Sequence, residues 1–159
     1  MPRERRRTPA RVLRSFSDAM FYEQRFSDLD AAVDEVHTRF QKKIAEPRTN
    51  GAADAFCRLQ LAVHEWIGNL IDHASFRGRA PEVHVRIWKE QGRLHCTIED
   101  NSEGFDLDGE LDPKREMVKE MRSFPDGGMG LLMLEAGTEQ AEYTAIEHNG
   151  NRLTLAVVL

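Results

Sequence analysis

The feature that most constrains the fold of this chain is the stretch from Leu59 to Phe76, LQLAVHEWIGNLIDHASF. Its apolar residues recur at intervals of three and four, the spacing of one helix face. They are Leu59, Val63, Trp66, Ile67, Leu70, Ile71 and Ala74. The pattern predicts a long helix with one apolar face.

Glu65 and Asn69 lie four residues apart in this stretch, so their side chains would leave neighbouring turns on one stripe of the helix. The amide oxygen of Asn69 is a hard ligand of the kind that Mg²⁺ takes. The carboxylate of Glu65 could accept a proton from a hydroxyl that attacks a terminal phosphate. Because such pairs are also common on solvated helix edges, the interpretation depends on the residues that follow.

The composition is that of a soluble globular protein with a core. The chain has 159 residues, of which 40% are hydrophobic and 31% charged. The formal net charge of −5 gives no general attraction to nucleic acid or to an anionic membrane. No apolar run reaches membrane-spanning length, so we expect a cytoplasmic protein without membrane or direct nucleic-acid contact. Cys57 and Cys96 are expected to be buried, reduced thiols.

Residues 1–14 form a basic N-terminal arm with six arginines and one acid, Glu4. This arm could contact nucleic acid or an acidic partner, but a solvated tail is the interpretation we favour. Residues 15–159 are expected to form one domain.

Within this domain the pattern predicts alternating strands and helices. The first elements are a strand over Ala19–Phe26, a helix that is capped by Ser27 and ends before Pro47, and the long helix. A hairpin of Val83–Trp88 and Leu94–Asp100 follows, and then a short helix over Arg115–Met121 and a helix within Asp126–Glu135. The last element is a hairpin of Glu142–His148 and Arg152–Leu159 that turns at Asn149–Gly150. The charged segment from Asp108 to Pro125 could be a mobile lid or a fixed surface helix between loops.

Three further features carry the chemistry of a nucleotide site. Asp100 ends a predicted strand, where its carboxylate could accept a hydrogen bond from the exocyclic amine of adenine. Gly104 would let the backbone approach the base closely. Gly127, Gly128 and Gly130 precede a helix, where free backbone N–H groups bind phosphates well. Each feature alone is common in ordinary turns. Their order along the chain, however, favours a nucleotide site.

This order resembles the Bergerat-type ATP-binding fold of the GHKL superfamily, shared by DNA gyrase, the large heat-shock chaperones, MutL and histidine kinases. The matching motifs are E-x-x-x-N at Glu65 and Asn69, DNSEGFD from Asp100, and GGMG from Gly127. Within that superfamily the chain is most similar to the small anti-sigma-factor serine kinases of bacterial partner switching. Ser102 departs from the family pattern, which usually has glycine there.

The resemblance implies a two-layer α/β sandwich, an α+β arrangement with a mixed, mostly antiparallel sheet and helices on one face. It also implies that Asn69 ligates Mg²⁺, that Glu65 is the catalytic base and that Asp100 contacts adenine. The residues implied to shape the ATP pocket are Gly104, Gly127, Gly128 and Gly130, and His73 matches a histidine common at that helix end. The implied partners are a STAS-domain anti-anti-sigma protein, a sigma factor and a second copy of the chain.

Three functions compete on this basis. The first is a protein serine kinase that also acts as an anti-sigma factor, and the second is an ATP-gated binding module without useful kinase activity. Glu65 favours the first, because a pure binder needs no base. The third, an isolated histidine-kinase catalytic domain, is disfavoured because such sites usually carry Asn in place of Glu65. In addition, no clear pair of dimerisation helices with a phospho-accepting histidine precedes the domain.

Overall fold

The structure is a computed structural model that describes residues 20–46, 52–120, 129–148 and 150–159. Its strands are β1 (Met20–Phe26), β2 (Val83–Glu90), β3 (Arg93–Asp100), β4 (Gln140–Ile146) and β5 (Gly150–Val158). Its helices are α1 (Leu29–Ile44), α2 (Ala53–His73), α3 (Leu107–Lys119) and α4 (Met129–Gly137). The basic arm, Gly127 and Gly128 lie outside the described residues.

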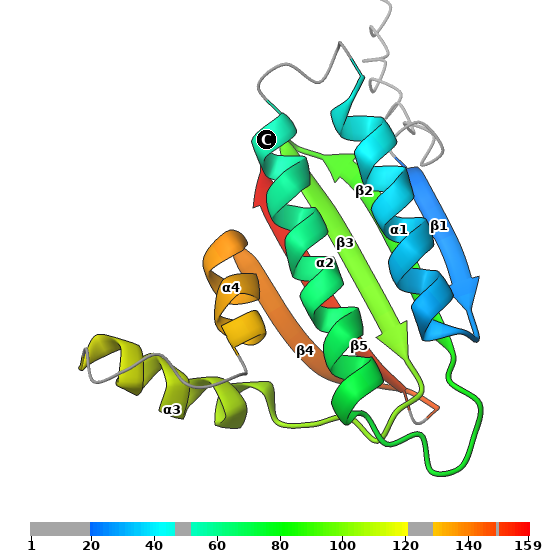
Figure 1. Cartoon of the computed structure of the whole chain (residues 1–159), viewed down its shortest axis with the longest axis vertical. Helices are drawn as coiled ribbons and strands as arrows, with labels where there is room; N and C mark the ends of the chain where they lie inside the picture. The colour runs from blue at the N-terminus through cyan, green and yellow to red at the C-terminus, as the bar shows by residue number, and fades with distance from the viewer. Residues whose placement is uncertain (1–19, 47–51, 121–128, 149) are drawn as a thin grey trace, which may run out of the picture.

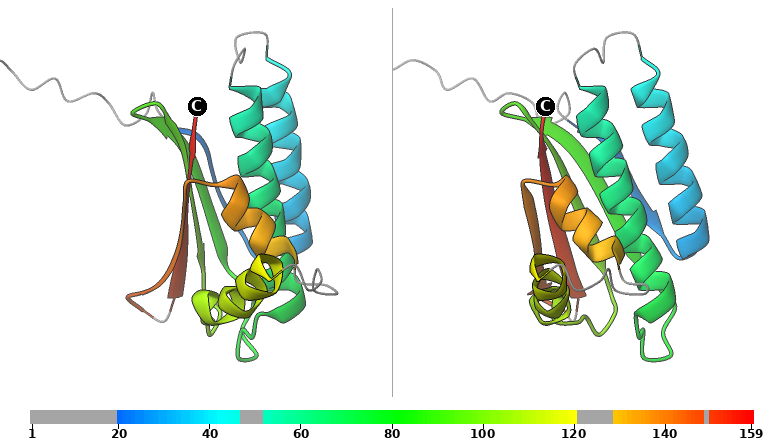
Figure 2. Two further views of the ribbon diagram at one scale, coloured as in Figure 1. Left: turned by 90° about the vertical axis from the view of Figure 1, so that its left-hand side faces the viewer. Right: turned by 60° about the vertical axis from the view of Figure 1, so that its left-hand side comes forward.

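The strands form one five-stranded sheet in the order β1-β2-β3-β5-β4, and the four described pairings are all antiparallel. Figure 1 shows α1 and α2 lying side by side along the sheet, with α4 beside α2. The side view in Figure 2 shows the helices on one face of the sheet. The expected two-layer α/β sandwich with helices on one face is therefore confirmed.

The central hairpin follows the predicted alternation. Gln91 and Gly92 both have positive φ, 50° and 73°, as a two-residue type I′ turn requires. The side chains predicted for the core face are at most 1% exposed: Val83, Val85, Ile87, Leu94, Cys96 and Ile98. The hairpin therefore supplies the centre of the sheet, and its strand β3 ends at Asp100.

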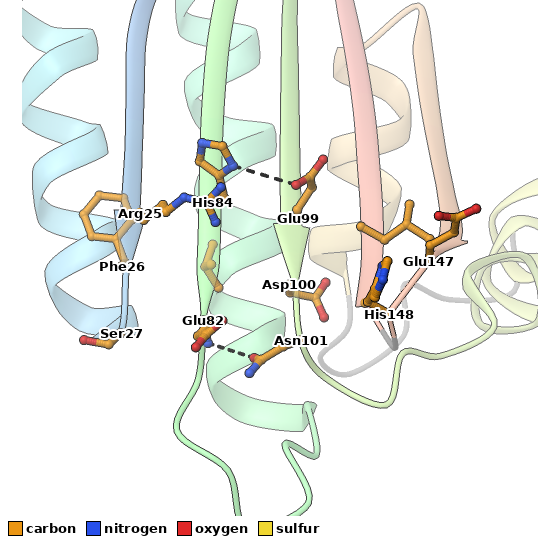
Figure 3. Close-up of a pocket in the computed structure, with 13 residues that line it drawn as sticks. Arg25, Phe26, Ser27, Glu82, His84, Glu99, Asp100, Asn101, Glu147 and His148 are labelled. Carbon is orange, nitrogen blue, oxygen red and sulfur yellow. Dashed lines mark hydrogen bonds and ion pairs between the residues drawn. The ribbon is translucent and has the colours of Figure 1, made fainter.

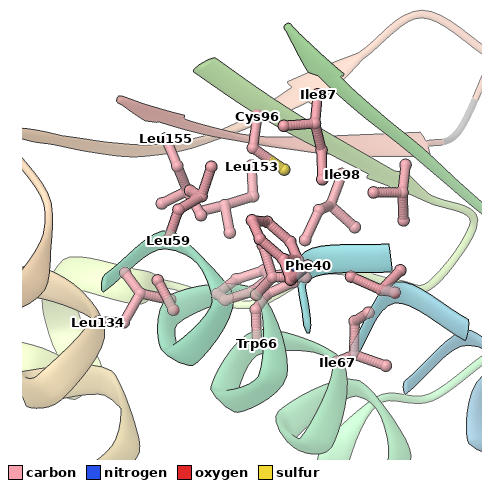
Figure 4. Close-up of a cluster of buried hydrophobic side chains, with 14 of the residues drawn as sticks. Phe40, Leu59, Trp66, Ile67, Ile87, Cys96, Ile98, Leu134, Leu153 and Leu155 are labelled. Carbon is pink, nitrogen blue, oxygen red and sulfur yellow. The ribbon is translucent and has the colours of Figure 1, made fainter. Parts of the chain in front are cut away.

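The core lies between this sheet and α2. Trp66 and Leu59 of α2 and Phe40 of α1 are fully buried against Leu153 and Leu155 of β5, together with the hairpin residues (Figure 4). Truncating a side chain of this kind to alanine typically costs about 2–5 kcal/mol of stability. This packing fixes the rotation of α2 and hence the direction in which its polar stripe points.

Several local predictions were wrong. The α1 helix is capped by Asp28, whose Oδ1 accepts from the Ala31 N–H at 3.1 Å, rather than by Ser27. The long helix ends at His73 because Ala74 is extended, with ψ of 139°. Cys57 is exposed, because it lies on the solvent side of α2, whereas Cys96 is buried as expected. Gly150 pairs with Ile146 as the first residue of β5, so it is not part of the turn.

The helix in the charged segment also differs from its predicted range, Arg115–Met121. The structure begins α3 at Leu107, because the Oδ1 atom of Asp106 accepts from the Gly109 N–H at 3.0 Å and caps the first turn. Leu107 and Leu111 then bury one stripe of the helix. Pro113 lies within α3, where it removes one backbone hydrogen bond without ending the helix.

Candidate functional site

Helix α2 presents Glu65, Asn69 and His73 along one stripe. Asn69 and His73 line a cavity of about 340 Å³. Its described lining residues come from α2, α3, α4 and the loop after β3: Asn69, Leu70, His73, Ala74, Ser102, Gly104, Phe105, Glu110, Lys114 and Leu131. The structure therefore brings Asn69, His73 and Gly104 together in one site, here called the α2–α3 cavity.

Glu65 lies one turn before Asn69 and contacts the start of α4. A Cβ atom added to Gly130 would fall onto the Glu65 Oε2 atom. A glycine is therefore needed at position 130 for α4 to approach the Glu65 carboxylate this closely. This contact joins the predicted acid to the one described glycine of the GGMG motif.

The side chain of Asn69 has unused hydrogen-bonding capacity. Its side chain is partly buried, and its Nδ2 atom is buried without a hydrogen-bond partner in the described structure. Among the described residues, no group of three or more His, Cys, Asp or Glu side chains could hold a metal ion. The Nδ2 N–H group could donate to a phosphate oxygen, and the Oδ1 atom of the same amide is an oxygen ligand of the kind that Mg²⁺ takes.

Asp100 lies behind the cavity wall and is 4% exposed. Its Oδ1 atom accepts from the Ser102 N–H at 2.9 Å, from the Ser102 hydroxyl at 2.5 Å and from Asn151 Nδ2 at 3.2 Å. Its Oδ2 atom accepts from the Tyr143 hydroxyl at 3.3 Å. We call Asp100, Ser102, Tyr143 and Asn151 the strand-end cluster. Of these four, Ser102 lines the α2–α3 cavity, and Asp100 does not.

The cluster explains two features of the DNSEGFD motif. Ser102, which replaces the usual glycine, is 5% exposed and uses its hydroxyl to donate to Asp100 and to accept from the Gly104 N–H at 3.1 Å. Gly104 has a φ of +76°, and a Cβ atom there would lie 2.6 Å from Asn151 Oδ1. Position 104 therefore requires glycine for both its backbone conformation and its close approach to Asn151.

Aromatic contacts join the strand-end cluster to α2. The Trp66 ring stacks on Phe105 at 5.2 Å and meets Tyr143 edge-on at 4.8 Å. Burial, and then the nearby Asp100 carboxylate, raise the pKa of Tyr143, so its hydroxyl stays protonated as a donor. Phe105 is 38% exposed and lines the cavity.

The α3 side of the cavity is held by ion pairs. Arg115 donates from Nε to Glu135 Oε2 of α4 at 3.0 Å, from Nη2 to Glu135 Oε1, and from Nη1 to Asp112 at 2.6 Å. These hydrogen bonds, first to Glu135 and then to Asp112, raise the pKa of Arg115. The Arg115 side chain is still 37% exposed, so water screens this contact.

A second cavity, of about 590 Å³, lies beside the ends of β1, β2 and β3 and the β4–β5 turn (Figure 3). It includes Asp100 but none of the other predicted site residues. Four carboxylates line it, those of Glu82, Glu99, Asp100 and Glu147, against one arginine, Arg25. Because carboxylates repel phosphates, this cavity suits a nucleotide less well than the α2–α3 cavity.

Sequence reasoning missed Tyr143, Asn151, Phe105 and Lys114. Asn151 could have been found from strand register, because it pairs directly with Asp100 on the neighbouring strand. Phe105 directly follows Gly104 but carries no chemical signal of its own. Lys114 is one of many charged residues in its segment, and only the position of α3 distinguishes it.

A comparison with protein-family models identifies the superfamily to which this chain belongs. The family model for the histidine kinase-like ATPase domain (HATPase_c_2) matches residues 5–157. The chain belongs to the histidine kinase-like ATPase domain family. None of the curated proteins compared with the chain matches it.

Membership in this ATPase family implies that the domain binds ATP and has a kinase-like function. The family match covers the strand-end cluster, Asn69, Glu65 and both glycine motifs. The α2–α3 cavity is thus the candidate ATP site.

No helix among the described residues is long and apolar enough to cross a membrane.

Proposed function

We propose that this histidine kinase-like ATPase domain is an ATP-dependent protein serine kinase and anti-sigma factor. It phosphorylates a serine of a STAS-domain anti-anti-sigma protein, and it sequesters a sigma factor in the cytoplasm. The observation that carries the proposal is the position of Glu65. Its carboxylate lies one turn from Asn69 and against Gly130, at the start of α4.

In the proposed reaction Asn69 would hold Mg²⁺ through its amide oxygen, and the bound cation would supply charge neutralisation at the phosphates. Glu65 accepts the proton of the attacking serine hydroxyl, which is a poor nucleophile at neutral pH. The serine oxygen forms a bond to the γ-phosphorus as the bond between this phosphorus and the β–γ bridging oxygen breaks. The products are phosphoserine, ADP and a proton on Glu65.

The partners follow from the resemblance to partner-switching kinases rather than from any contact. The antagonist brings its serine to the open side of the α2–α3 cavity, and the sigma factor binds when the antagonist is phosphorylated. We further propose that the protein acts as a homodimer.

The test is phosphoryl transfer by the wild type and by Glu65→Gln. Each is incubated with Mg-ATP and candidate STAS proteins, and serine phosphate is detected by mass. The Gln side chain keeps the size of Glu but cannot take the proton, so we expect transfer to fall by roughly 10²–10⁴. ATP affinity should stay within a few-fold, and sigma-factor binding should survive.

Transfer at a near-normal rate by Glu65→Gln would remove Glu65 as the base. A wild type that phosphorylates no STAS partner but binds a sigma factor only with ATP would instead be an ATP-gated binding module.

A further inference from the structure

The charged groups of the α2–α3 cavity are few. Among its described lining residues, the charged or titratable side chains are those of His73, Glu110 and Lys114. Lys114 is the one Lys or Arg in that set. Its side chain is partly buried, and no ion pair or hydrogen bond joins it to another described residue. An ammonium that lines a cavity and has no partner among the described residues has its donors available to an anion.

The way in which α3 packs explains why Lys114 faces the cavity. Leu107, Leu111 and Arg115 recur every four residues, and this stripe holds α3 to the rest of the protein. The two leucines are buried, and Arg115 binds Glu135 of α4. Lys114 belongs to the adjacent stripe, four residues after Glu110, and both of them line the cavity.

Neighbouring Arg115 is not available for the same role. Its guanidinium already donates to Glu135 and Asp112. The ammonium of Lys114, by contrast, has three donors free, and an ammonium is a compact point charge suited to phosphate oxygens.

We propose that Lys114 binds the phosphate chain of the nucleotide in the α2–α3 cavity. This assignment rests on the proposed nucleotide site and adds to it a contact from α3. The lysine offsets the negative charge that the phosphates add beside Glu110. It also links α3 to the bound nucleotide, since the phosphates reach both Lys114 and the α2 residue Asn69.

The test compares the affinities of ATP, ADP and adenosine for the wild type and for Lys114→Ala. ATP and ADP are titrated by calorimetry, and adenosine by NMR, which measures weak binding. Loss of one charge-assisted contact should weaken ATP and ADP by roughly 10- to 100-fold. Adenosine affinity should change by less than about twofold, because adenosine has no phosphate.

Two control variants lie on the same helix. Lys119→Ala removes the same charge from an exposed position outside the cavity lining, so its ATP affinity should match the wild type. Glu110→Gln removes a negative charge from the cavity one turn from Lys114, so ATP should bind a few-fold more tightly. Lys114→Arg should retain most of the ATP affinity.

Unchanged ATP affinity in Lys114→Ala, with a wild type that binds ATP, would overturn this assignment alone. An equal loss for adenosine and ATP would also overturn it, since the lysine would then support the shape of the cavity. A wild type that binds no adenine nucleotide would overturn both this assignment and the proposed function.

Discussion

The strand-end cluster and the α3 side close the same cavity by different means. In the cluster, one buried carboxylate, Asp100, accepts four hydrogen bonds and holds the loop after β3 in place. On the α3 side, a partly exposed ion pair between Arg115 and Glu135 joins two short helices. Buried polar networks are rigid when fully satisfied, whereas exposed ion pairs contribute little. The comparison indicates a rigid strand-end cluster and an adjustable α3 side.

The largest expected difference is in stability. Asp100→Ala leaves the buried N–H and hydroxyl donors of Ser102 without their acceptor and removes one of the two acceptors of Asn151 Nδ2, so the free energy of unfolding should fall by about 2–4 kcal/mol. Arg115→Ala removes a screened surface contact and should cost about 0–1 kcal/mol. Urea unfolding of both variants measures these values. Equal losses would show that the two sides do not differ in rigidity.

Gly130→Ala should lower the rate of phosphoryl transfer without unfolding the protein. The added Cβ atom would displace the Glu65 carboxylate, the flexible end of a side chain, so the fold should survive. Phosphoryl transfer should fall by roughly 10- to 100-fold through misplacement of the base, with ATP affinity nearly unchanged. Gly68→Ala is the matched control on α2, because its Cβ atom would meet nothing within 4 Å. A normal transfer rate in Gly130→Ala would contradict the role of this contact.

Amide hydrogen exchange should measure the rigidity of the strand-end cluster and of α3 separately. The N–H groups of Ser102 and Gly104 are hydrogen-bonded within the cluster and should exchange slowly even without nucleotide. The amides of residues 114–119 in α3 should exchange fast in the empty protein and more slowly once ATP is added. Slow exchange in α3 of the empty protein would make it a fixed surface helix.

Of these two sides of the cavity, alkaline pH should weaken only the strand-end cluster, and we expect this effect to be the smallest. The pKa of Tyr143 is raised in the folded state, so its stabilising contribution is complete below about pH 10, the unfolded value, and is lost as the pH rises further. Arg115, with its own raised pKa, stays charged over this range. Relative to Tyr143→Phe, the wild type should lose up to about 1 kcal/mol per pH unit above pH 10 in thermal unfolding. A constant difference between the two proteins would contradict this.

The fold was largely predictable, because its signals are local and regular. Alternation from Val83 to Asp100 and the helical spacing after Leu59 determine which side chains reach the core. The start of α3 was missed because Asp106, which caps it, lies in the DNSEGFD motif, and this motif was interpreted as part of a nucleotide site and not as a helix start. In the same way, charge and proline content obscured the leucine stripe of α3.

The grouping of the candidate site was predictable where motifs have a fixed spacing. Asn69 and Gly104 line the α2–α3 cavity and Glu65 lies one turn from Asn69, whereas their chemical roles stay predictions. The site was not predictable where the role arises from packing between distant segments. Tyr143 reaches Asp100 across the sheet, and Lys114 reaches the cavity only because α3 docks on α4. Such contacts depend on how the elements pack and leave no periodic signal in the sequence.

The central claim is that α2 supplies the metal–phosphate contact of an ATP site through Asn69. Calorimetric titration of Asn69→Ala with ATP, with and without Mg²⁺, tests it most directly. We expect the variant to lose most of the Mg²⁺-dependent affinity, by roughly 10-fold or more, and to bind metal-free ATP within a few-fold of the wild type. Equal losses with and without Mg²⁺ would contradict the claim and remove Asn69 from the metal site.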